Sequence, residues 1–289
     1  MNLVTFTLSV AAVYACVCLL AFLLQERLLY FPSRRHECVP SAVGLDYRDV
    51  RFETDDGLGL HGWLVPGDPR RPIVLICHGN AGNVSDNLEI IEVFHGLGAG
   101  VFAFDYRGYG ASEGRPGEEG TYRDADAAWR HLTDHEGYRE DAIVAFGHSL
   151  GSAVAIELAS RRSLGGLIVE ASFPSLPQLA ARHYRLLPVG LLARLRYDSR
   201  PRVKDLRIPK LFLHSRNDEI VPCALGRQLY TMAPEPKTFV EIAGGHNDAF
   251  LVSRRIYVRA LEEFLRPVAA SVGPGDLSVR RPGDPGDTP

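Results

Sequence analysis

The sequence predicts an α/β domain built on a mostly parallel β-sheet with helices on both faces, and three observations predict it. Short apolar runs alternate with helical patterns along most of the chain, as expected when helices connect parallel strands. The apolar run at 142–146 leads into Gly147-His148-Ser149-Leu150-Gly151 and then into a small-residue helical pattern at 152–160. Before the domain, residues 8–24 are almost wholly apolar and form a separate segment.

The N-terminal segment has the length and composition of a membrane-spanning helix. No charged side chain occurs in residues 1–25, and the apolar stretch is long enough to cross a bilayer. A cleaved signal peptide is the alternative, but it would need a basic leading region and small residues at its end. We therefore predict a single-pass anchor over 1–25, followed by the domain at 26–268. The basic residues near the span all follow it (Arg27, Arg34 and Arg35), which places the domain in the cytoplasm by the positive-inside tendency.

Eight runs are expected to form the strands of an eight-stranded sheet. Residues 45–53 and 58–65 alternate polar and apolar side chains around Asp55-Asp56-Gly57, the pattern of a β-hairpin. The other strands are expected at 73–77, 101–104, 142–146, 164–169, 210–214 and 237–242, and further helices near 84–97, 125–132, 222–232 and 249–265. Continuous apolar runs among these strands are typical of a sheet covered on both faces.

Two stretches fall outside this alternation. About forty residues, 171–208, separate two expected strands, more than a simple crossover needs, and their leucines recur at roughly helical spacing. We expect a small helical cap there. Arginines lie between the leucines, so the sharper hypothesis is that this surface docks on an anionic membrane. Residues 269–289 end in a Pro-, Gly- and Asp-rich tail and are predicted to be disordered.

Composition excludes several classes of function. The net charge of −3, without a basic stripe, argues against a nucleic-acid partner. Five scattered cysteines without a Cys-x-x-Cys pair predict neither a disulfide framework nor a zinc site. His131 and His135 have the spacing of metal ligands on a helix, but no third ligand lies nearby in sequence. We therefore expect no metal and no other cofactor.

A Gly-x-Ser-x-Gly between a strand and a helix is typical of a catalytic serine held on a sharp turn, and Ser149 is the predicted nucleophile. Such a serine needs a base and an orienting acid, which follow in the chain order serine, acid, histidine. His246 is the only histidine beyond position 214 and is the predicted base. Asp218, four residues before Pro222, is the predicted acid, with Glu219 and then Asp248 as alternatives.

Two backbone N–H groups should form the oxyanion hole that stabilises the negative charge. Leu150, directly after the serine, supplies one of them. Asn80, in the loop His78-Gly79-Asn80 after the strand at 73–77, is expected to supply the other.

We expect structural rather than catalytic roles for four other polar residues. His78 is expected to shape its loop, and His148 to pack the serine turn. Asp105 and Arg107 are expected to hold a glycine-rich loop through an ion pair with each other.

Five motifs occur in a consistent order: His78-Gly79-Asn80, Phe104-Asp105-Tyr106-Arg107-Gly108-Tyr109-Gly110, the serine turn, the segment around Asp218, and Gly245-His246-Asn247-Asp248. Together they resemble the α/β-hydrolase superfamily over roughly residues 25–266. Within it, the chain resembles membrane-anchored abhydrolase-domain serine hydrolases, which include relatives of protein depalmitoylases. Ser215 is a departure, because these relatives commonly have glycine there.

The resemblance implies a membrane-anchored serine hydrolase that cleaves carboxylic esters or thioesters with a hydrophobic acyl chain through an acyl-enzyme. A peptidase or amidase using the same residues is an alternative. A non-catalytic binding protein on a hydrolase fold is another, but such proteins usually lack one member of the catalytic set.

Overall fold

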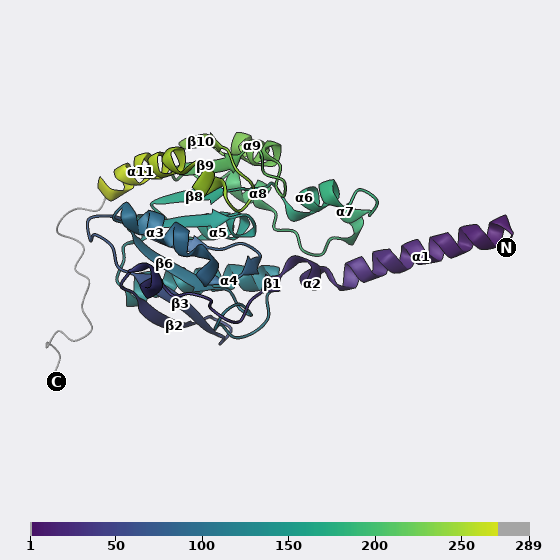
Figure 1. The fold of residues 1–289 in the computed structure, drawn as a ribbon, viewed down its shortest axis with the longest axis horizontal. Helices are drawn as coiled ribbons and strands as arrows, with labels where there is room; N and C mark the ends of the chain where they lie inside the picture. The colour runs from purple at the N-terminus through teal and green to yellow at the C-terminus, as the bar shows by residue number, and fades with distance from the viewer. Residues whose placement is uncertain (1, 271–289) are drawn as a thin grey trace.

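The computed structural model describes residues 2–270, in which an α/β domain follows a long N-terminal helix (Figure 1). The main sheet has eight strands in the order β10-β9-β8-β7-β4-β6-β3-β2. Neighbouring strands run parallel except at β2–β3 and β3–β6, so the predicted eight-stranded, mostly parallel sheet is confirmed. The strands are β2 (Arg48–Glu53), β3 (Gly59–Val65), β4 (Ile73–Cys77), β6 (Gly100–Asp105), β7 (Ile143–His148), β8 (Gly166–Glu170), β9 (Lys210–Ser215) and β10 (Lys237–Ile242).

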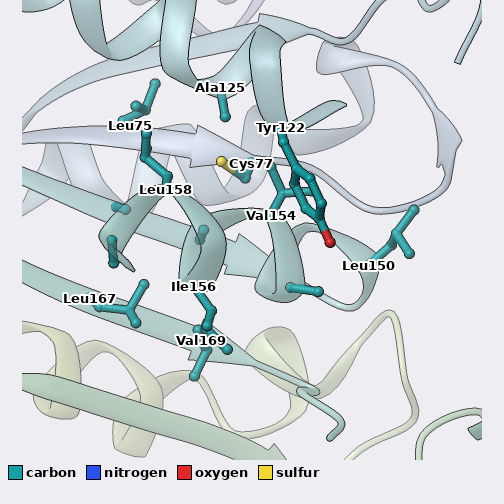
Figure 2. Close-up of a cluster of buried hydrophobic side chains, with 14 of the residues drawn as sticks. Leu75, Cys77, Tyr122, Ala125, Leu150, Val154, Ile156, Leu158, Leu167 and Val169 are labelled. Carbon is teal, nitrogen blue, oxygen red and sulfur yellow. The ribbon is translucent and has the colours of Figure 1, made fainter. Parts of the chain in front are cut away.

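Helices cover both faces of the sheet, as the continuous apolar strands predicted. In β4, Leu75 and Cys77 belong to the core beneath α4 and α5 (Figure 2). Val74 and Ile76, which point the other way, belong to the core beneath α3 and α11. This alternation follows from the two-residue period of a strand. The covering helices are α3 (Leu88–Gly96), α4 (Glu118–Arg130), α5 (Leu150–Arg161), α9 (Cys223–Met232) and α11 (Arg254–Ala270).

The N-terminal helix α1 (Leu3–Leu23) projects away from the domain (Figure 1). Its mean hydropathy is 2.4 and it buries none of its residues, and it is the one helix within residues 2–270 that is long and apolar enough to cross a membrane. A short helix, α2 (Gln25–Leu29), follows it. Next, β1 (Phe31–Pro32) pairs in parallel with β5 (Ala81–Gly82), which brings the chain after α1 to the loop that follows β4.

The segment 171–208, here called the cap segment, carries three short helices between β8 and β9: α6 (Leu176–His183), α7 (Val189–Leu192) and α8 (Ser199–Val203). Figure 1 places α6 and α7 on the side of the domain that faces α1. The remaining short elements are η1 (Pro40–Val43), η2 (Val84–Asn87), the π-helical turn η3 (His131–His135), η4 (Glu140–Ala142) and α10 (Ala249–Val252).

The C-terminal helix differs in detail from the expectation. The single helix expected at 249–265 is divided at Ser253 into α10 and α11, where the Ser253 hydroxyl bonds the Ala243 backbone. Helix α11 continues to Ala270, two residues into the predicted tail. The rest of that tail, 271–289, lies outside the described residues.

Candidate active site

Ser149 sits on the sharp turn between β7 and α5, with a positive φ of 53°. That conformation costs a non-glycine residue on the order of 1–3 kcal/mol. The two flanking glycines are required by close packing. A Cβ on Gly147 would collide with the Gly151 backbone, and a Cβ on Gly151 would collide with the carbonyl oxygens of Cys77 and His78. The turn is held by the Ser149 amide, which donates to the Glu170 carbonyl oxygen at 3.0 Å.

The structure brings Ser149, His246 and Asp218 into one hydrogen-bonded row. His246 Nε2 lies 3.0 Å from the Ser149 hydroxyl, and His246 Nδ1 lies 2.8 Å from Asp218 Oδ2. All three residues are buried, with 6% to 8% of each exposed. Because the carboxylate accepts from Nδ1–H, the Nε2 atom is left as an acceptor for the serine proton.

The loop carrying Asp218 fixes its carboxylate. Asp218 Oδ1 accepts from the amides of Ile220 and Val221 at 2.9 and 2.7 Å. Burial alone would raise the pKa of this carboxyl, but the hydrogen bond to His246 and those from the two amides lower it below its ordinary value. The side chain therefore stays a carboxylate at neutral pH, able to stabilise an imidazolium.

The two alternative acids have other partners. Glu219 accepts from the backbone amide of His246 at 3.1 Å, and Asp248 accepts from the amide of Gly245. Both carboxylates therefore hold the loop that presents His246, and Asp218 is the carboxylate on its ring nitrogen.

Two further histidines form hydrogen bonds to the backbone of the loops that carry His246 and Asp218. His148 Nε2 donates to the His246 carbonyl oxygen at 3.1 Å, and the two rings lie 4.9 Å apart. Burial and the nearby His246 lower the pKa of His148 to about 4, so His148 is neutral at physiological pH. His214 Nε2 donates to the carbonyl oxygen of Val221 at 2.8 Å, which fixes the loop after Asp218.

The predicted oxyanion-hole amides belong to adjacent segments. Strand pairing sets Cys77 of β4 opposite Gly147 of β7, so the loop after β4 runs beside the serine turn. Within residues 2–270, the backbone N–H groups of Asn80 and Leu150 donate to no other protein group. The N–H of Leu150 is unpaired because it opens α5. Both donors are thus available to a ligand.

The chain after α1 holds the loop that carries Asn80. The Asn80 side-chain amide donates to the Leu29 carbonyl oxygen at 2.6 Å, and the Phe31 amide donates to the Asn80 carbonyl oxygen at 2.9 Å. The Tyr109 hydroxyl donates to that same oxygen at 2.7 Å. Nearby, the hydroxyls of Tyr30 and Tyr197 lie 2.7 Å apart, which joins this segment to the cap segment.

His78 packs within the core next to two tyrosine rings. Its ring is buried against Tyr106 and Tyr109, and Nδ1 lies 2.8 Å from the Gly79 carbonyl oxygen. Burial lowers the pKa of His78. A structural contribution to this loop fits these contacts.

The expected ion pair between Asp105 and Arg107 is wrong. Arg107 instead bonds Asp124 of α4 and Asp56 of the hairpin turn. Asp105 faces β3, where it lies opposite His61 in the strand register. The reason is that Asp105 and Asp124 are both fully buried and each needs a close partner. Strand register brings His61 to Asp105, and helix packing brings Arg107 to Asp124.

Asp105 is the centre of a network that the sequence did not reveal. Its Oδ2 lies 2.7 Å from His36 Nε2 and 3.3 Å from His61 Nδ1, and its Oδ1 accepts from the Val84 amide at 2.8 Å. Burial alone would raise the pKa of Asp105, but these bonds hold it well below its usual value. His36, His61 and Asp105 are also the group in residues 2–270 whose ligand atoms lie close enough to hold a metal. Their mutual hydrogen bonds already account for the arrangement.

Comparisons with known proteins point to one superfamily. A hydrolase family model described as Serine aminopeptidase, S33, matches residues 68–201. The Mycobacterium tuberculosis protein Rv2307c is 40% identical over 263 residues, covering 90% of this chain and 94% of its own. The alpha/beta hydrolase domain-containing protein WAV2 of Arabidopsis thaliana is 33% identical, covering 85% of this chain and 88% of its own.

Two further matches bear on the membrane and on the fold. A membrane protein of Saccharomyces cerevisiae, YNL320W, is 34% identical, covering 85% of this chain and 88% of its own. Among solved structures, the Pyrococcus furiosus esterase Pf2001 superposes with a TM-score of 0.70 at 21% identity, covering 82% of this chain and 98% of its own. At that identity the likeness concerns the fold.

Proposed function

The chain belongs to the α/β-hydrolase superfamily, and from this premise we propose that it is a membrane-anchored serine hydrolase that cleaves carboxylic ester or thioester bonds. One observation carries the proposal. The Ser149 hydroxyl lies 3.0 Å from His246 Nε2, while Nδ1 of the same ring lies 2.8 Å from Asp218. A hydroxyl next to an oriented, buried imidazole is what nucleophilic catalysis by serine requires.

In the proposed mechanism, Ser149 Oγ attacks the acyl carbon as His246 Nε2 takes its proton. Asp218 stabilises the resulting imidazolium through Nδ1–H. The carbonyl oxygen becomes negatively charged and accepts from the amides of Leu150 and Asn80, each worth about 3 kcal/mol of barrier in comparable sites. The tetrahedral intermediate collapses, His246 protonates the leaving alcohol or thiol, and an acyl-serine remains.

Deacylation reverses the roles. His246 removes a proton from water, whose oxygen attacks the acyl-serine. Collapse of the second tetrahedral intermediate releases the carboxylic acid, and His246 returns the proton to Ser149. These steps need no group beyond the residues named.

The proposed anchor is α1. Its 21 residues would span about 31 Å at 1.5 Å per residue, close to the thickness of a hydrocarbon core. The yeast relative YNL320W is described as a membrane protein, which supports this assignment. The arginines after the helix favour a cytoplasmic domain. Proximity to the bilayer favours a substrate with a hydrophobic acyl chain.

A peptidase or amidase is the second candidate, and the family description Serine aminopeptidase favours it. The same residues would serve, but an amine leaving group needs full protonation by His246 before it can depart. Turnover of matched esters, thioesters and amides with varied acyl length separates the two. Faster turnover of amides than of esters would replace the first proposal with the second.

A fluorophosphonate probe tests whether the site is catalytic at all. Wild type and Ser160→Ala should label, because Ser160 lies at the far end of α5 and bonds Glu157. Ser149→Ala should not label, and its kcat should fall on the order of 10⁶-fold. An unlabelled wild-type protein would favour a non-catalytic binding protein, and equal labelling of Ser149→Ala would show that Ser149 is not the labelled nucleophile.

A further inference from the structure

We propose that the tip of the cap segment, residues 184–192, inserts into the hydrocarbon core of the membrane beside α1. The inference rests on the proposed function, because it requires α1 to span the bilayer. The first observation is contact: the Tyr14 hydroxyl, in the middle of α1, donates to the Leu186 carbonyl oxygen at 2.8 Å. Apolar side chains of both elements line a shared groove (Phe6, Val10, Val13, Val17, Leu186 and Leu187).

The position of Tyr14 sets the depth of the tip. Tyr14 lies nine residues before the end of α1 at Leu23, which is about 14 Å along a helix axis. The hydrocarbon core is about 30 Å thick. A spanning α1 therefore carries Leu186 about halfway into the core. A cap that stayed in water could not touch Tyr14.

The side chains of the tip suit that depth. Leu186 and Leu191 are each 87% exposed, and Tyr184 is 55% exposed. Exposed leucines in such a cluster are unusual on a water-facing surface. Transfer of an exposed leucine side chain from water to hydrocarbon is favourable, because it removes apolar surface from water. The bilayer supplies the apolar environment that these side chains lack within the protein.

Backbone polar groups must be paired in hydrocarbon, and two side chains of the N-terminal segment pair two carbonyl oxygens of the tip. Tyr14 satisfies the Leu186 carbonyl oxygen. Gln25, the first residue of α2, donates to the Leu192 carbonyl oxygen at 2.8 Å and accepts from the amide of Arg194, just after the tip, at 2.7 Å. Within the tip, the amides of Leu191 and Leu192 donate to the Pro188 carbonyl oxygen.

Basic residues mark the level of the headgroups. The Arg194 guanidinium lies over the Phe22 ring, 5.2 Å from its centroid, at the end of α1 that joins the domain. That is where anionic headgroups would meet it. Arg185, next to Leu186, opposes insertion and must extend its charged end towards the interface along its apolar stem. The predicted docking of this leucine- and arginine-rich segment thus becomes insertion of the leucines, with arginines at the interface.

The inserted tip connects the bilayer with the catalytic loops. At the base of the cap segment, His183 Nε2 donates to the Ile220 carbonyl oxygen at 2.8 Å. The Ile220 amide in turn donates to Asp218. An acyl chain that leaves the bilayer along the cap segment would therefore approach the loop that orients His246. The substrate class expected is an ester or thioester whose acyl chain resides in the membrane.

Tryptophan fluorescence in the full chain, reconstituted into phosphatidylcholine–phosphatidylglycerol vesicles, tests the depth of the tip. The two native tryptophans, Trp63 and Trp129, are buried in the domain and supply a constant background. Leu186→Trp reports on the tip. Val10→Trp, on exposed α1, is the positive control, and Ile256→Trp, on exposed α11 at the far side of the domain, is the negative control (Figure 1).

The emission of Leu186→Trp and Val10→Trp should be blue-shifted, and lipids brominated at mid-chain should quench it. The same lipids should not quench the emission of Ile256→Trp. Quenching at Val10→Trp without quenching at Leu186→Trp overturns the insertion of the tip and leaves the anchor standing. Quenching at neither position overturns the anchor and the insertion together. Fluorophosphonate labelling of Ser149, measured in the same samples, reports separately on the hydrolase.

Discussion

Replacing Gly151 by alanine should damage the proposed oxyanion hole while leaving the catalytic row of side chains in place. A Cβ at this position would lie 2.5 Å from the His78 carbonyl oxygen and closer still to that of Cys77. Ordinary contacts begin near 3.4 Å, so the segments must separate by at least about 1 Å. The His78 carbonyl oxygen cannot swing away freely, because it accepts from the buried Tyr106 hydroxyl.

The magnitude follows from what the two segments carry. One leads to the Asn80 amide and the other begins with the Leu150 amide, so separation displaces the proposed donors from each other. A misplacement of about 1 Å costs on the order of 10²-fold in rate, or about 2.7 kcal/mol of barrier. Overpacking costs typically 1–3 kcal/mol of stability, which a folded domain of this size should survive.

The assay is kcat/KM on a soluble ester, with thermal unfolding measured on the same samples. Gly96→Ala is the matched control, since a Cβ at Gly96 of α3 meets nothing within 4 Å; its activity should equal that of wild type. A folded Gly151→Ala variant with activity within roughly threefold of wild type, about 0.6 kcal/mol of barrier, would refute the assignment of the two donors.

Three further predictions concern buried polar groups near the serine. Burial raises the pKa of Glu170 to about 7, so the folded state binds more protons than the unfolded state between pH 4.5 and 7, and stability falls as pH rises through this range. Glu170→Gln removes this titration but can still accept from the Tyr257 hydroxyl. In urea unfolding, the substitution should raise the free energy of unfolding by about 3 kcal/mol at pH 8 and leave it unchanged below pH 4.5. Asp218→Asn should lower kcat by about 10⁴-fold in steady-state assays, because the amide favours the wrong imidazole tautomer. Asn80→Ala keeps the backbone N–H but removes the bond to Leu29, and should lower kcat by roughly tenfold with little change in KM, about one hydrogen bond in barrier.

The sequence predicted the sheet because each strand carries its own signal. Buried strands such as 73–77 need a continuous apolar run, and the hairpin at 48–65 needs alternation around a turn. Ser149, His246 and Asp218 were also proposed from local patterns, since each follows a strand end where a loop can present it at the same edge of the sheet. Their distances required the structure, because no local pattern fixes how far apart three loops lie.

The network around Asp105 could not be predicted in the same way. His61 meets Asp105 because β3 and β6 pair with those two residues opposite each other, and a sequence without register information cannot supply that pairing. His36 comes from an irregular segment before the sheet and carries no motif. Arg107, which lies close to Asp105 in sequence, was therefore the wrong partner to expect for Asp105. Arg107 instead forms ion pairs with Asp56 and Asp124.

The contacts of the chain after α1 constrain how the proposed anchor can act. A flexible linker would hold the domain near the membrane without fixing its orientation. Here α2 follows α1 directly, and Phe31 pairs with Ala81 beside the loop that carries Asn80. Phe31 is only the seventh residue after Leu24, so the connection spans at most about 25 Å of chain. With α1 as the proposed anchor, this connection would hold the proposed active site at a fixed height and orientation above the bilayer. That is the condition under which a cap tip can insert and an acyl chain can reach Ser149 without leaving the protein surface.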